Sequence, residues 1–173
     1  LKMTYIAIFS LFILVIAAAI PDYKTTLIPN KIILVGFIAA IILQSFGLLK
    51  EDWLTLFIDF IIFFLPMTIL WIIGTLTSFQ AFGAGDVKLI SIMALFVEPS
   101  LLVIIFISAM VLVSLVNITK LKFSFYKEFP KEIYYFIFFG IPGKPKERLQ
   151  NVPFGPFLAI TTIATISYFY FII

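Results

Sequence analysis

The chain consists mainly of long apolar runs that are separated by short polar breaks. Of its 173 residues, 63% are hydrophobic and only 12% are charged. A soluble domain has roughly 45–50% apolar residues and about 25% charged residues. A water-soluble core of this size cannot bury so much apolar surface. We therefore expect an integral membrane protein whose apolar side chains face lipid.

Six apolar runs are candidates for membrane-spanning helices, since a spanning helix needs about 20 mostly apolar residues. We predict an all-α, polytopic fold with about six transmembrane helices in a single domain over residues 1–173. The fourth run is short, and we expect its helix to extend upstream into the preceding glycines; a re-entrant fourth segment, giving five spans, is the alternative. The six runs are Met3–Ile20, Ile32–Leu49, Trp53–Ile73, Val87–Val97, Leu101–Asn117 and Phe154–Ile173.

The distribution of positive charge predicts the orientation, because cytoplasmic loops of membrane proteins are enriched in lysine and arginine. If the loops at about 21–31, 74–85 and 118–152 are cytoplasmic, their side of the membrane carries ten of the 12 basic residues, and only Lys2 and Lys50 lie on the other side. We therefore expect a multi-pass protein of the cell (inner or cytoplasmic) membrane. The ten basic residues are Lys24, Lys31, Lys88, Lys120, Lys122, Lys127, Lys131, Lys144, Lys146 and Arg148.

The last predicted loop contains an apolar and aromatic segment, Ile133–Phe139, that is too short to cross a bilayer. Lys127, Lys131 and Glu132 lie close to it in the sequence. This combination is typical of a helix that lies in the membrane interface. We predict an interfacial helical segment here, with anchoring to anionic lipid as its simplest role.

The chain contains neither cysteine nor histidine. Cysteine nucleophiles, Ser-His and Cys-His triads and nearly all zinc chemistry are therefore excluded. Asp, Glu, Lys, Tyr, Ser and Thr remain as residues for catalysis, and carboxylates in or beside apolar runs are the most informative of them.

Asp22 follows the first apolar run, and Asp86 precedes the fourth. Each has a simple structural interpretation, Asp22 as a turn residue and Asp86 as the cap of a helix that begins after Gly83-Ala84-Gly85. The predicted topology nevertheless places both carboxylates at the same membrane face, where a pair can share one proton as in aspartyl proteases. Asp59 lies inside the third run and ranks below this pair, with a hydrogen bond to a neighbouring helix as its structural role.

Glycines at 83 and 85 allow another backbone to approach Asp86 closely. Lys88 follows two residues later, and residues i and i+2 do not share a helix face, so it is expected to reach headgroups or another carboxylate. Pro153-Phe154-Gly155-Pro156-Phe157 is interpreted as a tight entry into the last helix.

Three blocks in this order resemble the type IV prepilin peptidase and preflagellin peptidase family of membrane aspartyl proteases. They are Asp22 with Ile28-Pro29-Asn30, the segment from Gly83 to Leu89 that contains Asp86, and the segment from Pro153 to Phe157. Longer bacterial members carry an N-terminal, often cysteine-containing segment before the first helix, and we expect this chain to resemble a short form without it. That segment is associated with N-methylation, so methyltransferase activity is not among the activities that we expect from the resemblance.

The resemblance implies a single transmembrane peptidase domain that cleaves short basic leader peptides at the cytoplasmic face. Asp22 and Asp86 would be the catalytic residues, supported by Gly83, Gly85, Lys88, Pro29 and Asn30. It also implies no metal and no organic cofactor. The partners would be prepilin-like or preflagellin-like substrates and the lipid bilayer, with no nucleic acid.

Two other classes of protein remain open at this point. A small transporter or channel component would use the aspartates as a proton or cation site. A non-catalytic scaffold of a secretion system would use them only structurally. The proximity of the two carboxyl groups distinguishes these classes from a protease. A protease needs carboxyl groups that one water molecule can bridge, whereas a transporter more often places ionisable groups near the bilayer midplane.

Overall fold

The computed structural model describes residues 5–49, 52–76, 83–120 and 153–171, and these residues form six helices. The predicted all-α fold is confirmed. The expected interfacial helix at Ile133–Phe139 lies outside the described residues. The helices are α1 (Tyr5–Thr25), α2 (Asn30–Ser45), α3 (Trp53–Leu76), α4 (Ala84–Phe96), α5 (Pro99–Lys120) and α7 (Gly155–Phe171).

Three of the helices, α1, α3 and α5, are long and apolar enough to cross a membrane. Their lengths correspond to roughly 30–36 Å at 1.5 Å per residue, which matches a hydrocarbon core of about 30 Å. Many large apolar side chains on these helices point outward, among them Phe9, Leu54 and Ile107. The chain is thus a multi-pass membrane protein. The total of about six crossings stays a prediction, because α2, α4 and α7 are shorter.

Helix α4 lies inside the bundle and is surrounded by the others. Every residue from Asp86 to Phe96 is buried except Lys88. The helix packs mainly against α3, and also against α2 and α1. A helix that is apolar all round belongs in an interior, and its length is then set by its neighbours and not by the bilayer. This explains why 13 residues are enough for α4. It begins upstream of Asp86, as the sequence predicts.

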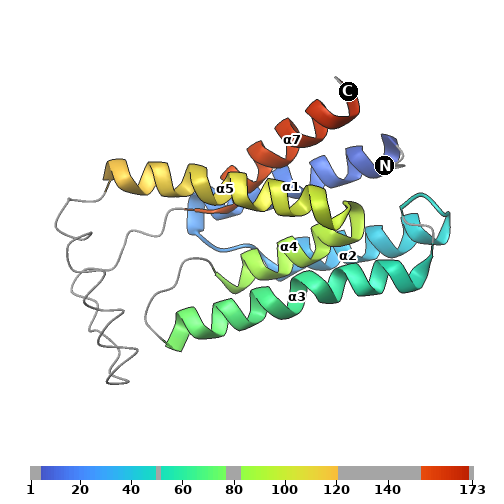
Figure 1. The fold of residues 1–173 in the computed structure, drawn as a ribbon, viewed down its shortest axis with the longest axis horizontal. Coiled ribbons are helices and arrows are strands. Elements are labelled where there is room, and N and C mark those ends of the chain that lie inside the picture. Colours follow the sequence, from blue (N-terminus) through green and yellow to red (C-terminus); the bar gives the residue numbers. More distant parts are fainter. Residues whose placement is uncertain (1–4, 50–51, 77–82, 121–152, 172–173) are drawn as a thin grey trace.

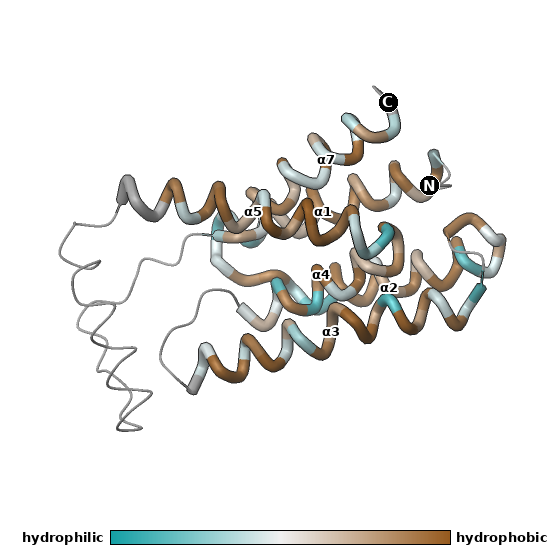
Figure 2. The backbone as a smooth tube through the Cα atoms, in the orientation of Figure 1, coloured by the Kyte–Doolittle hydropathy of each residue, from teal (hydrophilic) through white to brown (hydrophobic). Residues whose placement is uncertain are grey.

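The helices run side by side along the long axis of the molecule (Figure 1). On the far side of α4 from α3, α1 packs against α7, and α7 packs against α5. The ends of α1, α3 and α5 and the starts of α2, α4 and α7 lie toward the same end of the bundle (Figure 1). Figure 2 shows that apolar residues dominate the length of every helix. The three predicted cytoplasmic loops therefore all join helix ends on one side.

The loop predicted at 21–31 is shorter in the structure, because α1 continues past Pro21 to Thr25. A proline has no N–H group and so cannot donate one of the hydrogen bonds of a helix, but the next helical turn can still form after it. The Thr26 N–H group still donates to the Asp22 carbonyl oxygen at 2.8 Å. The helix ends where Thr26 adopts a left-handed φ of 54°. Asp22 is therefore a helical residue. Similarly, α3 extends to Leu76, beyond the predicted end at Ile73.

Candidate active site

Asp22 lies in the last turn of α1 and is only 3% exposed. One of its carboxylate oxygens, Oδ2, accepts a hydrogen bond of 2.7 Å from the backbone N–H group of Gly155. Gly155 is the first residue of α7, more than a hundred residues away in the chain. A hydrogen bond to a charged group stabilises a fold by about 1.5–3 kcal/mol. This contact thus fixes the end of α1 against the start of α7.

The start of α7 is well suited to hold a carboxylate. The first N–H groups of a helix have no partner within the helix, and this end carries partial positive charge. Pro156 has no N–H group, so Gly155 is the donor at this position of the helix start. Phe154 is buried, and its ring lies 6.1 Å from that of Phe106 on α5. The aromatic contact holds the helix start in place, so that its donor meets Asp22.

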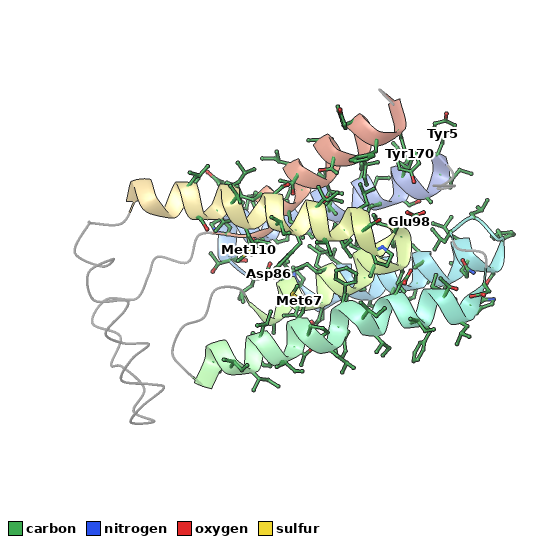
Figure 3. The ribbon with its side chains drawn as sticks, in the orientation of Figure 1. Tyr5, Met67, Asp86, Glu98, Met110 and Tyr170 are labelled. Atoms are coloured by element: carbon green, nitrogen blue, oxygen red, sulfur yellow. The ribbon has the colours of Figure 1, made fainter. Side chains whose placement is uncertain are left out.

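Asp86 lies in the first turn of α4 and is 7% exposed. Its Oδ2 atom accepts a hydrogen bond of 2.8 Å from the N–H group of Gly83, directly before the helix. Its other oxygen, Oδ1, is buried and has no hydrogen-bond partner among the residues that the structure describes. Figure 3 shows Asp86 toward the end of the bundle away from Tyr5, Glu98 and Tyr170. The expectation that Asp86 is itself the helix cap is wrong, because Gly83 is the cap residue and Asp86 is the third residue of α4. Its carboxylate still stabilises the helix entry by accepting from Gly83, and one carboxylate oxygen remains unused by this contact.

The two carboxylates influence each other electrostatically. Burial raises the pKa of Asp86 to about 7, the hydrogen bond from Gly83 opposes this rise, and the negative charge of Asp22 adds to it. Asp86 lies in α4, outside the three candidate spans. A like charge that disfavours ionisation is typical of two acids that share a site. At neutral pH, Asp86 therefore exists partly as the neutral acid.

The segments that carry the two aspartates are packed together through Ile28 and Gly85. Ile28 lies in the connection between α1 and α2 and is buried. A Cβ atom added at Gly85 would lie 3.0 Å from Ile28 Cβ and 3.4 Å from its backbone nitrogen. Only a residue without a side chain allows this close approach of α4. Gly85, one of the predicted supporting residues, therefore has a definite packing role.

The other predicted supporting residues, Pro29, Asn30 and Lys88, lie at the starts of α2 and α4. Pro29 is the residue immediately before α2, and Asn30 is the first residue of that helix. The Nζ atom of Lys88 donates to Oδ1 of Asn30 at 3.0 Å. Lys88 is exposed while Asp86 is buried, in agreement with their spacing on the helix. The lysine therefore joins α4 to the start of α2.

Asp59 does not join this pair. It is 6% exposed and lies in the first third of α3. Helix α3 ends at Leu76, and the chain then leads to Gly83 and Asp86. Asp59 lies roughly 25 Å of helix before Leu76. Among the described residues, no group of three or more acidic side chains is arranged to hold a metal ion.

The role of Gly155 was not identified from the sequence, although its motif was singled out as a helix entry. The Cβ of an alanine there would lie 2.9 Å from Asp22 Oδ2, so the position needs glycine. A glycine flanked by Phe154 and Pro156 at a helix start is a signal for a free N–H donor. Nothing in a single sequence indicates that the acceptor is the distant Asp22.

The arrangement provides two buried carboxyl groups, each held through one oxygen by the N–H group of a glycine. One group can be neutral while the other is ionised, which is the requirement for combined general acid and general base catalysis.

Comparison with known proteins identifies one family. The model of the type IV leader peptidase family matches residues 9–118, more than half of the chain. The matched region contains both aspartates. No curated protein and no solved structure matched the chain in the corresponding searches.

Replacing Gly155 with alanine tests how Asp22 is positioned. The new Cβ atom would lie 2.9 Å from Asp22 Oδ2 and must displace the carboxylate. Misplacement of a reacting group by about 1 Å can lower rates by about 100-fold, so we expect Gly155→Ala to lose at least about tenfold in substrate cleavage. Cleavage of a leader-bearing substrate and thermal stability in detergent are the measurements.

Gly83→Ala is the matched comparison for this experiment. Its added Cβ atom would lie 3.6 Å from Asp86 Oδ2, an ordinary contact, and the N–H donor is retained. We expect a smaller loss of cleavage than in Gly155→Ala. Equal losses in the two variants would contradict a specific role for the Gly155 position.

Proposed function

The chain belongs to the type IV leader peptidase family, and on this basis we propose that it is an aspartic endopeptidase that uses Asp22 and Asp86. Its substrates are prepilin-like or preflagellin-like proteins, from which it removes a short basic leader peptide. The observation that carries the proposal is the pair of buried carboxylates on α1 and α4. Each is held by one glycine N–H group, and the charge of one acts on the other.

In the proposed reaction, Asp22 is the base and Asp86 is the acid. The ionised Asp22 takes a proton from a water molecule, and the water oxygen bonds to the scissile carbonyl carbon. Asp86 gives its proton to the carbonyl oxygen, which produces a neutral tetrahedral intermediate. Asp22 then gives the proton that it took from water to the amide nitrogen, and Asp86 takes a proton from one hydroxyl group as the C=O bond re-forms and the C–N bond breaks. The leader leaves with a new carboxyl group, and the mature protein gains a new amino terminus.

We assign the acid role to Asp86 on the basis of its surroundings. Within the described part of the chain, its buried Oδ1 atom has no hydrogen-bond partner, and burying an unpaired oxygen costs more free energy when the carboxyl group is charged than when it is neutral. The Gly155 N–H group at the start of α7 donates to Oδ2 of Asp22 and opposes the effect of burial on its charged form. We assign the base role to Asp22 because, in a pair that shares one proton, the partner of the protonated acid is ionised.

The position of the site favours a peptidase over a transporter. Asp22 lies in the last turn of α1, and Asp86 lies in the first turn of α4, so both acids are at helix ends. We propose that this end faces the cytoplasm, because the basic residues are concentrated in its loops. An apolar substrate helix in the membrane would then present the peptide bond just inside the cytoplasmic face.

Replacing each aspartate with asparagine tests the two-acid mechanism. Asparagine retains an oxygen that can accept the Gly155 or Gly83 hydrogen bond, so membrane insertion and folding should survive. We expect Asp22→Asn and Asp86→Asn each to lower cleavage by about 100-fold or more, the range attributed to acid–base catalysis. The measurement is the shortened product from a leader-bearing prepilin incubated with the purified protein.

Asp59→Asn is the matched control, because Asp59 is a buried aspartate of similar exposure in another helix. We expect it to keep its cleavage activity. Substantial activity in either of the first two variants, or an inactive but folded Asp59→Asn, would contradict the assignment.

The rate of cleavage should depend on pH near neutrality. The pKa of Asp86 is raised to about 7, so its proton is present below this pH and is lost above it. Since the proposed acid must be protonated, kcat/KM should fall as the pH rises through about 7. The measurement is kcat/KM in proteoliposomes between about pH 5 and pH 9, with thermal stability followed in parallel. A rate that keeps rising above neutral pH would show that Asp86 is not the acid.

A further inference from the structure

A groove of about 410 Å³ opens between α2, α3 and α4 on the side of α4 that carries Lys88. Its wall is mainly apolar and aromatic, with Leu34 and Phe37 from α2 and Phe60 and Phe64 from α3. The rings of Phe60 and Phe64 stack at 5.4 Å, and Phe37 lies 6.3 Å from Phe60. The volume is within the range of roughly 300–1,000 Å³ that is usual for small-molecule sites.

Three polar side chains line the groove, and two of them, Lys88 and Asn30, lie together at the starts of α4 and α2. The hydroxyl group of the third, Ser91, donates to the backbone carbonyl oxygen of Val87. Lys88 donates one hydrogen bond to Oδ1 of Asn30. This leaves two further donors on Nζ, and it turns the Nδ2 amide group of Asn30 into an available donor. Among the described residues, no carboxylate forms an ion pair with Lys88. The ammonium group therefore has capacity to bind an external anion.

The start of α2 adds positive potential at this end of the groove. The residue before the helix is Pro29, which forms no side-chain cap. The Ile32 N–H group donates to the Pro29 carbonyl oxygen at 3.0 Å, but among the described residues no side chain caps the start of α2, and such a helix end attracts anions. Three independent features thus meet where Asn30 begins α2: an exposed lysine, a side-chain amide and an uncapped helix start. At the other end of the groove, roughly 10 Å along α2, the lining is aromatic.

We propose that this groove binds one anionic phospholipid from the leaflet at this face. The phosphate accepts hydrogen bonds from the remaining Nζ donors of Lys88 and from the side-chain amide of Asn30, and an acyl chain runs over Leu34, Phe37 and Phe60. Basic pockets between membrane helices commonly bind anionic headgroups in this manner. Leu34 is 58% exposed and Phe37 is 39% exposed, so the groove is accessible from the bilayer.

The size and charge of the groove favour a lipid over a peptide. One turn of a helix about 10 Å wide and 5.4 Å long fills roughly 400 Å³, so the groove holds about a single turn of a substrate helix. A basic leader peptide would be repelled by Lys88. A flexible acyl chain with a negative headgroup matches both the narrow apolar wall and the cationic end. The proposal does not depend on the peptidase activity.

Native mass spectrometry of the full chain tests the proposal. The protein is released from micelles that contain equal amounts of phosphatidylglycerol and phosphatidylcholine with identical acyl chains. We expect one retained phosphatidylglycerol that is preferred over phosphatidylcholine. In Lys88→Gln the preference should fall about fivefold, which is the effect of removing one basic residue near a lipid headgroup. Lys88→Arg should retain it.

Lys24→Gln is the matched control, because Lys24 is an exposed lysine in the last turn of α1 and does not line the groove. It should keep the preference. Leu34→Trp, which fills the groove, should lower retention of both lipids, whereas Leu65→Trp on another exposed surface should not.

Three results would overturn the proposal. The first is equal retention of the two lipids by the unmodified protein. The second is an equal loss of preference in Lys24→Gln and Lys88→Gln. The third is a Leu34→Trp variant with normal lipid retention but a raised KM for the leader-bearing substrate, which would show that the groove receives the substrate helix instead.

Discussion

The structure depends above all on the need of two buried carboxylates for hydrogen-bond donors. A buried, unpaired carboxylate is strongly destabilising, and the donors here are backbone N–H groups at helix starts. Asp22 receives its bond from Gly155 at the start of α7, and Asp86 receives its bond from Gly83 before α4. The first bond joins the two ends of the chain, and the second fixes the turn that enters the central helix. Each bond occupies one oxygen, which leaves the other oxygen for chemistry in the proposed mechanism.

The central helix α4 explains how acids can lie at the end of a membrane bundle without facing lipid. Its apolar residues are buried on all sides, so its first turn is covered by neighbouring segments. The approach of Gly85 to Ile28 brings this turn against the connection that follows Asp22. The same shielding raises the pKa of Asp86 to about 7. The packing that encloses the short helix α4 is thus also the reason why we assign the acid role to Asp86 and the base role to Asp22.

Much of this architecture is predictable from the sequence, for identifiable reasons. Long apolar runs predict the helices of a membrane protein, because both the lipid-facing and the core-facing residues of such helices are apolar. The three motif blocks indicate the family. Helix ends are less predictable, since Pro21 is typical of a helix end and yet lies within α1. The donor to Asp22 is not predictable, because the contact with Gly155 depends on tertiary packing. The short length of α4 likewise leaves open, from sequence alone, whether it spans the membrane or is enclosed by other helices.

The central claim is that Asp22 and Asp86 meet at one site, and cysteine crosslinking tests it most directly because the chain has no natural cysteine. Cysteines would replace both aspartates, and a short flexible bifunctional thiol reagent would be added to the protein in membranes. A pair at positions 22 and 59 provides the control, since Asp59 lies far along α3. The account predicts efficient crosslinking of the pair at 22 and 86 and little crosslinking of the control. Failure of the pair at 22 and 86 to crosslink, or equal crosslinking of both pairs, would contradict it.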